Sequence, residues 1–171
     1  MCIVIDTNTL SCVFNTDDAN HNDFEPVSKW ILEDKGKVVF GGTKYMQELE
    51  KAPKYLKLFE LFRQVHKVVI ISAAEVDKEQ KTAEQKIQDK DFDDPHIVGI
   101  LKASGCKLVC SRDSRSFPYI THKVFFTKRN KPKIYSTKRN ADLLCDNNIA
   151  ACCKPSSKTT KAQRNKMEGL V

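Results

Sequence analysis

The run Cys2-Ile-Val-Ile-Asp6 indicates the fold class of this 171-residue chain. A short, continuous apolar stretch rich in β-branched residues is typical of a strand buried on both faces, as in a parallel sheet. The run ends at an acidic residue, and open parallel sheets bind ligands outside the carboxyl ends of their strands. We therefore expect a central parallel strand with Asp6 at its functional edge.

Helical and strand-like segments alternate along the rest of the chain. Further strands are predicted at residues 37–40, 68–71, 107–110 and 133–136. Helices are predicted at residues 24–35, 43–62 with an interruption near Pro53, 73–90, 94–105 and 141–153. This alternation predicts an α/β fold in which helices cover both faces of a parallel sheet.

Charge divides the chain into two parts. Residues 1–122 hold 17 Lys/Arg against 19 Asp/Glu, whereas residues 123–171 hold 12 against 3. The basic part indicates attraction to polyphosphate, although a solvated lysine-rich tail explains the last residues equally well. We expect one domain over residues 1–150 and a basic, flexible C-terminal tail over residues 151–171.

The apolar and cysteine patterns argue against several classes of protein. No apolar run reaches the roughly 18 residues that a membrane span needs, and Met1 leads into the first strand without a basic leader. We therefore expect a cytoplasmic protein with no membrane partner. The seven cysteines contain no C-x-x-C pair. This argues against structural zinc and a disulfide framework, so we expect reduced, mostly buried thiols.

Four carboxylates fall where the predicted fold brings side chains together. Asp6 and Asp113 follow predicted strands, Glu48 lies in the helix after the second strand, and Asp94 begins the helix before the fourth. Converging carboxylates repel one another unless a cation neutralises them, and oxygen ligands suit Mg²⁺ or Mn²⁺. Such a metal activates water against a phosphodiester. The set therefore predicts hydrolytic phosphoryl transfer.

Each acid taken alone has a simpler explanation. Asp94 before Pro95 is typical of a helix N-cap, Asp113 can cap the helix that follows it, and Glu48 fits a surface position. Asp6 needs a partner, because an acid directly after a buried strand is costly to leave unpaired. The prediction of a metal centre therefore depends on the four acids as a set.

The four acids lie in segments that resemble the PIN domain, motif by motif and in order. The segments are Ile3-Val-Ile-Asp-Thr-Asn8, Gly42-Thr-Lys-Tyr-Met-Gln-Glu48-Leu, Asp94-Pro-His-Ile-Val-Gly-Ile-Leu and Lys107-Leu-Val-Cys-Ser-Arg-Asp113-Ser-Arg-Ser-Phe117. The resemblance covers about residues 1–145 and implies a PIN-like three-layer sandwich with a five-stranded parallel sheet. It also implies that the chain cuts RNA, with the catalytic and metal-binding acids Asp6, Glu48, Asp94 and Asp113.

The resemblance assigns supporting roles as well. Asn8 and Ser111 match polar positions that hold the acids or the attacking water in similar proteins, and ordinary turn hydrogen bonding is the alternative. The chain departs from the family pattern around the third acid. Pro95-His96 follows this acid in place of the usual small residues, and Asp91 or Asp93, which precede it, could replace Asp94 as the ligand. His96 lacks metal-ligand spacing and receives no catalytic role, although it is close enough to that acid to merit a test.

Basic side chains provide candidate contacts to the substrate. Lys128 and Arg129 belong to a segment in which basic and aromatic residues interleave, a mixture that combines phosphate contacts with base stacking. A solvated loop is the alternative for this segment. Arg112 and Arg115 flank Asp113, so we expect them to meet substrate phosphates near the cut.

The leading hypothesis is a divalent-metal-dependent endoribonuclease acting on single-stranded or structured RNA. Many similar small proteins are toxins, which would give the chain an antitoxin-like protein partner, and a homodimer is expected by analogy. The competing class is a non-catalytic RNA-binding module that uses the basic C-terminal third. A third class, the aspartate-nucleophile phosphatases, needs a second acid where Asn8 stands. The sequence leaves the choice between RNA and DNA open.

Overall fold

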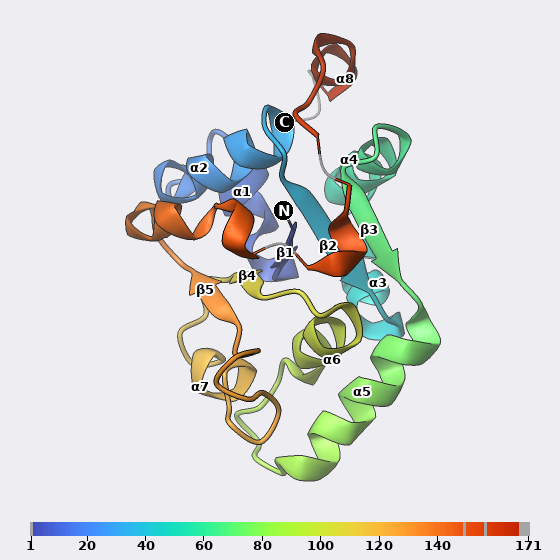
Figure 1. The fold of residues 1–171 in the computed structure, drawn as a ribbon, viewed down its shortest axis with the longest axis vertical. Helices are drawn as coiled ribbons and strands as arrows, with labels where there is room; N and C mark the ends of the chain where they lie inside the picture. Colours follow the sequence, from blue (N-terminus) through green and yellow to red (C-terminus); the bar gives the residue numbers. More distant parts are fainter. Residues whose placement is uncertain (1, 149, 156, 168–171) are drawn as a thin grey trace.

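The computed structural model of the chain describes residues 2–148, 150–155 and 157–167. Five parallel strands form one sheet in the order β3-β2-β1-β4-β5. They are β1 (Cys2–Ile5), β2 (Lys37–Gly41), β3 (Val68–Ile71), β4 (Leu108–Cys110) and β5 (Lys133–Tyr135). Helices flank the sheet to give a three-layer α/β sandwich (Figure 1), which confirms the predicted fold class.

Strand β1 lies at the centre of the sheet, as its apolar sequence predicts. All of its residues are buried, and Ile3 pairs with Val38 of β2 while Val4 pairs with Val109 of β4. The edge strand β3 is more open, with Ile70 50% exposed. The contrast follows from position, because an edge strand has a neighbour on only one side.

The helices fall into two groups. Those before β3 are α1 (Leu10–Phe14), α2 (His21–Leu32), α3 (Thr43–Glu50) and α4 (Pro53–Gln64); the later ones include α5 (Ala73–Lys86), α6 (Pro95–Ser104) and α7 (Phe117–Ile120). Helix α3 of the first group contacts α5 and α6 of the second. Phe14 of α1 contacts Phe62 of α4, with ring centroids 5.5 Å apart. Right-handed crossovers put the two groups on opposite faces of the sheet. Helix α5 lies along α6 at the margin of the molecule (Figure 1).

Several boundaries differ from the sequence prediction. The helix expected at residues 141–153 was wrong, because short 3₁₀ turns replace it: η2 (Lys138–Leu143), η3 (Asp146–Asn148) and η4 (Ala151–Cys153). The side chain of Asn148 donates to the Leu143 carbonyl at 2.7 Å, and such local bonds compete with helix formation. The short helices α1 and α7 were not predicted, because they contain less than two turns of apolar periodicity.

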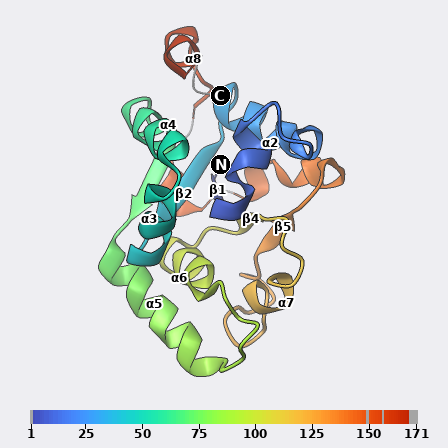
Figure 2. The same ribbon diagram turned by 180° about the vertical axis from the view of Figure 1, so that it is seen from behind.

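The C-terminal segment contains helix α8 (Lys161–Met167), which lies beside α4 in both views (Figures 1 and 2). The Gln163 side chain donates to the carbonyl of Val65 at 2.8 Å, and Met167 is buried. Residues 161–167 of the segment expected as a flexible tail therefore form a helix that packs on the domain. Among the helices in the described ranges, none is long and apolar enough to cross a membrane.

Candidate metal centre

The carboxyl ends of the central strands form the rim on which the predicted acids gather. Strand β1 ends at Asp6, and β4 leads through Ser111 to Asp113. Strand β2 turns into α3 at Gly42, whose φ of +84° belongs to the left-handed region that favours glycine. A Cβ at this position would lie 2.4 Å from the Val76 side chain, so the tight turn that presents α3 to the rim requires glycine.

Asp6 is almost completely buried, with 2% of its surface exposed. Its Oδ2 accepts a hydrogen bond from the Ser111 hydroxyl at 2.9 Å, and its Oδ1 accepts one from the Asn8 backbone N–H at 3.1 Å. Burial raises the pKa of Asp6, although these two hydrogen bonds oppose the rise. Neutral hydrogen-bond donors therefore hold the Asp6 carboxylate in place, but they do not balance its negative charge.

Ser111 links two of the predicted acids. Besides donating to Asp6, its Oγ accepts a hydrogen bond from the backbone N–H of Asp113 at 3.1 Å. The side chain is fully buried, so its orientation is fixed by these contacts. Asn8, by contrast, contacts Asp6 through its backbone N–H, and its side chain is exposed.

Glu48 projects from α3 and carries its own set of partners. Its Oε2 accepts a hydrogen bond from the Thr7 hydroxyl at 2.7 Å, and its Oε1 lies 3.4 Å from the Lys44 ammonium. Burial raises the pKa of Glu48, but nearby His96 and the Thr7 hydrogen bond outweigh it and bring the pKa to about 2. Glu48 is therefore ionised at neutral pH and remains close enough to Asp6 to repel it.

His96 is a member of this group that the sequence analysis left without a role. Its ring is buried and its Nε2 lies 3.4 Å from Glu48 Oε2, yet within the described residues neither ring nitrogen has a hydrogen bond of acceptable geometry. The proximity of His96 opposes the raised pKa values of Asp6 and Asp94. The sequence did contain a signal for His96. It directly precedes the apolar run from Ile97 to Leu101, which is buried in α6.

Asp94 and its neighbour Asp93 complete the acidic rim. Oxygens of Asp93, Asp94 and Asp113 lie within 4.8 Å of one another. Burial, and then repulsion from Asp6, raise the pKa of Asp94 to about 6. Although Asp94 occupies the N-cap position of α6, its side chain forms no capping hydrogen bond with any described residue. The simple capping explanation therefore does not account for this carboxylate.

Asp113 is paired with an arginine from its own loop. Arg115 donates through Nε to Oδ1 at 3.1 Å and through Nη2 to Oδ2 at 2.8 Å. These hydrogen bonds lower the pKa of Asp113. The structure places Arg115 at the rim, whereas the Arg112 guanidinium lies 3.5 Å from the Cys12 sulfur.

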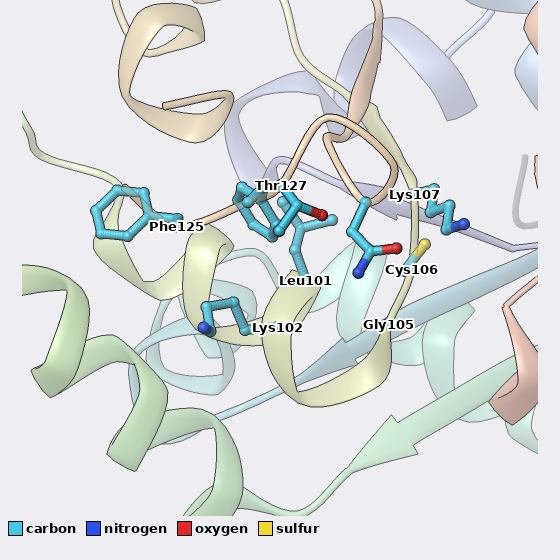
Figure 3. Close-up of a pocket in the computed structure, with 9 residues that line it drawn as sticks. Leu101, Lys102, Gly105, Cys106, Lys107, Phe125 and Thr127 are labelled. Carbon is cyan, nitrogen blue, oxygen red and sulfur yellow. The ribbon is translucent and has the colours of Figure 1, made fainter. Parts of the chain in front are cut away.

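The other predicted substrate contacts, Lys128 and Arg129, are not brought to the acids in the described structure. Both are exposed in the loop before β5. The flanking Thr127 and Asn130 line a pocket with Cys106 and Lys107, which precede β4 (Figure 3). That pocket lies at the amino end of β4, and Asp113 follows its carboxyl end.

The residues of the rim fit a hard divalent cation. The donors are carboxylate oxygens from several elements, the ligand type that Mg²⁺ and Mn²⁺ prefer. Asp6 and Asp94 have raised pKa values, and a bound cation would reverse the repulsion between them. We find no protein-family model, curated protein or solved structure that matches this chain. The chemistry of the site is therefore interpreted from its own geometry.

Proposed function

We propose that this protein is a divalent-metal-dependent endoribonuclease of the PIN type that hydrolyses phosphodiester bonds of RNA. The observation that carries the proposal is the grouping of carboxylates at the carboxyl edge of the sheet. Oxygens of Asp93, Asp94 and Asp113 lie within 4.8 Å of one another, Ser111 links Asp113 to Asp6, and the charges of Asp6 and Glu48 act on Asp94. A bound Mg²⁺ or Mn²⁺ would supply a Lewis acid and an activated water.

The protein's own side chains would divide the remaining work. Asp6 and Asp94 are the acids whose charge is least compensated, so they are the proposed principal ligands. The Ser111 hydroxyl bonds both to the Asp6 carboxylate and to the Asp113 backbone N–H, so it holds these two residues at a fixed distance. The Thr7 hydroxyl orients the Glu48 carboxylate. Preorganised donors and ligands of this kind cost little reorganisation during the reaction.

Arg115 is the proposed contact to substrate phosphate. Its side chain is largely exposed and reaches the rim through Asp113, so the guanidinium lies beside the proposed metal. Arginine recognises phosphate with the same planar, two-pronged geometry that it uses for carboxylate. Release of Asp113 toward a metal would leave Arg115 free to bind the phosphate next to the scissile bond.

The test is cleavage of labelled single-stranded and structured RNAs in Mn²⁺, Mg²⁺ or chelator. Wild type is compared with Asp6→Asn/Asp113→Asn and with the charge-matched control Asp17→Asn/Asp142→Asn, whose residues are exposed and lie outside the rim. The proposal predicts metal-dependent cleavage that is retained in the control and lost in the first variant.

Two further outcomes define the competing explanations. A substrate with one 2′-deoxyribose at the cut should still be cleaved, because water rather than the 2′-hydroxyl is the proposed nucleophile; protection by that change would contradict the mechanism. RNA binding without cleavage in any metal, and unchanged in Asp6→Asn/Asp113→Asn, would favour a non-catalytic RNA-binding module.

A further inference from the structure

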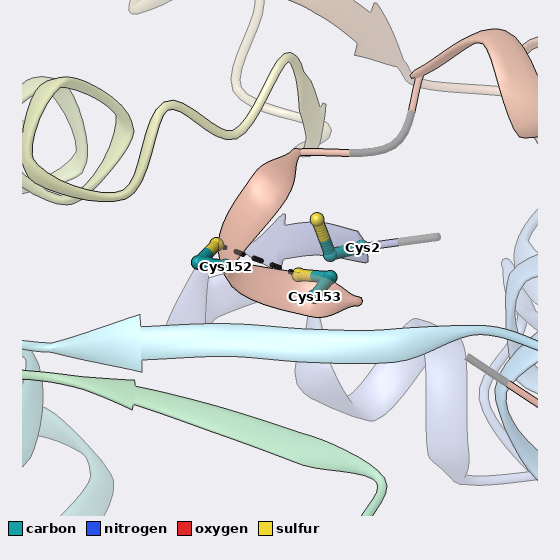
Figure 4. A group of neighbouring side chains, drawn as sticks. All are labelled: Cys2, Cys152 and Cys153. Carbon is teal, nitrogen blue, oxygen red and sulfur yellow. Dashed lines mark hydrogen bonds between the residues drawn. The ribbon is translucent and has the colours of Figure 1, made fainter. Parts of the chain in front are cut away.

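Four cysteines gather at the amino edge of the sheet, at the opposite ends of the strands from the acids. Cys2 begins β1, and Cys152 and Cys153 lie in the 3₁₀ turn η4 (Figure 4). Cys106 precedes β4. Cys2, Cys106 and Cys153 are buried, whereas Cys152 is exposed. The fold thus brings together thiols that are separated by about a hundred residues in the chain.

The distances among three of these sulfurs are compatible with binding to one tetrahedral metal ion. The Sγ atoms of Cys2, Cys152 and Cys153 lie within 4.8 Å of one another, and those of Cys152 and Cys153 are 3.6 Å apart. Zinc–sulfur bonds of about 2.3 Å in tetrahedral geometry place neighbouring sulfurs about 3.8 Å apart. The observed spacing is therefore close to that of a thiolate shell and well beyond the roughly 2.05 Å of a disulfide bond.

Cys106 supplies a fourth sulfur to this group. Its Sγ donates to the Cys2 carbonyl oxygen at 3.4 Å and to the Leu108 carbonyl oxygen at 3.5 Å. Cys106 is buried beside Cys2, so its sulfur lies next to the group of three cysteines. Thiolates are the form in which cysteines bind metal.

The other cysteines of the chain lie elsewhere. Cys12 contacts Arg112 in the first helical segment, Cys110 ends β4 near Asp6, and Cys145 contacts Asn148. All seven cysteines fall within the described ranges and are free. Burial of small apolar side chains does not by itself explain why three of these sulfurs lie within 4.8 Å of one another with a fourth cysteine beside them.

We propose that Cys2, Cys106, Cys152 and Cys153 bind one structural zinc ion. Soft thiolates select zinc over Mg²⁺ or Mn²⁺, so this centre is chemically distinct from the acidic rim. A closed shell of four cysteines leaves no position for a substrate, which makes the role structural. The ion would fasten η4 to the first strand and to the start of β4. The C-terminal segment would thereby be held to the domain.

Metal analysis of the full chain, purified under reducing conditions without chelator, tests this proposal. We expect about one zinc ion per chain in wild type and in the control Cys145→Ser. Cys152→Ser should lose most of this zinc, and because Cys152 is exposed the variant should still fold, as circular dichroism would show. Cys106→Ser tests whether Cys106 is the fourth ligand. Loss of zinc in this variant would show coordination by four cysteines, whereas retained zinc would show that three cysteines and a water bind the ion.

Cobalt substitution provides an independent readout. Co²⁺ in a tetrahedral thiolate shell gives a sulfur-to-metal charge-transfer band and intense visible absorption, whereas Co²⁺ bound only to carboxylates gives no charge-transfer band. We expect the band in wild type and in Asp6→Asn/Asp113→Asn, and not in Cys152→Ser. Absence of zinc and of the band in reduced, folded wild type would overturn the proposal. Because the readout does not involve RNA, it stands or fails separately from the nuclease activity.

Discussion

Replacing Asp94 with asparagine should stabilise the metal-free protein at neutral pH. The carboxylate is partly buried and faces Asp6, which raises its pKa from 3.8 to about 6. At about 1.4 kcal/mol per pKa unit, this difference corresponds to about 3 kcal/mol of unfavourable free energy in the folded state. Loss of a favourable interaction with the α6 dipole subtracts about 0.3–1 kcal/mol. The net gain for Asp94→Asn is therefore about 2 kcal/mol.

The pH dependence of this gain follows from linkage. Because the folded-state pKa is raised, the cost of ionising Asp94 is fully present above about pH 6 and absent below its unfolded value of 3.8. The free energy of unfolding of Asp94→Asn should therefore exceed that of wild type by an amount that grows as the pH rises from 3.8 to about 6. Asp94 forms no capping hydrogen bond with a described residue, so the substitution loses no such bond and the predicted gain in stability is not reduced by one.

Urea denaturation of wild type and Asp94→Asn in chelator, at pH 7 and at pH 4, measures the effect. Asp91→Asn is the control, because it removes an exposed acid from the same segment. A difference near zero at pH 7, or one equally large at pH 4, would refute the argument that repulsion at the rim destabilises the folded state. Added Mn²⁺ should stabilise wild type more than Asp94→Asn, since the variant lacks a proposed ligand.

Other variants probe single contacts. Ser111→Ala should lower the free energy of unfolding by about 2 kcal/mol in urea titrations, because it removes a buried hydrogen bond to a carboxylate; an unchanged midpoint would contradict the bridging role. Thr7→Val should raise the pKa of Glu48 above about 2, so its loss of stability should be present above about pH 4.5 and disappear toward pH 2; a loss independent of pH would point to packing alone. Gly99→Ala should cost about 1–3 kcal/mol in thermal unfolding, because its Cβ would lie 2.7 Å from the Val76 carbonyl; a neutral effect would mean that α5 moves freely.

Much of the fold could be predicted from the sequence because its central strands are buried on both faces. The apolar run of the central strand β1 matched the observed bounds. The run of the edge strand β3 also matched, and Pro53 marked the break between α3 and α4. The region from 138 to 153 was harder, because side chains such as Asn148 determine its turns through local hydrogen bonds. Such contacts have no periodic signature in the sequence.

The candidate site could be predicted in part. The positions of Asp6 and Asp113 after strands predicted their shared edge, since parallel strands end on one side of a sheet. The contribution of His96 depends on burial of its ring beside Glu48, which only the packing of α6 against α3 determines. The cysteine cluster was missed for the same reason, because Cys2 and Cys153 approach through the fold rather than through a short motif.

Calorimetric titration with Mn²⁺ determines whether the acidic rim binds a divalent cation. We expect saturable binding to chelator-treated wild type and to the charge-matched control Asp17→Asn/Asp142→Asn, whose residues are exposed, and loss of that binding in Asp6→Asn/Asp94→Asn. Binding that persists in Asp6→Asn/Asp94→Asn, or the absence of saturable binding to wild type, would contradict the proposed metal site.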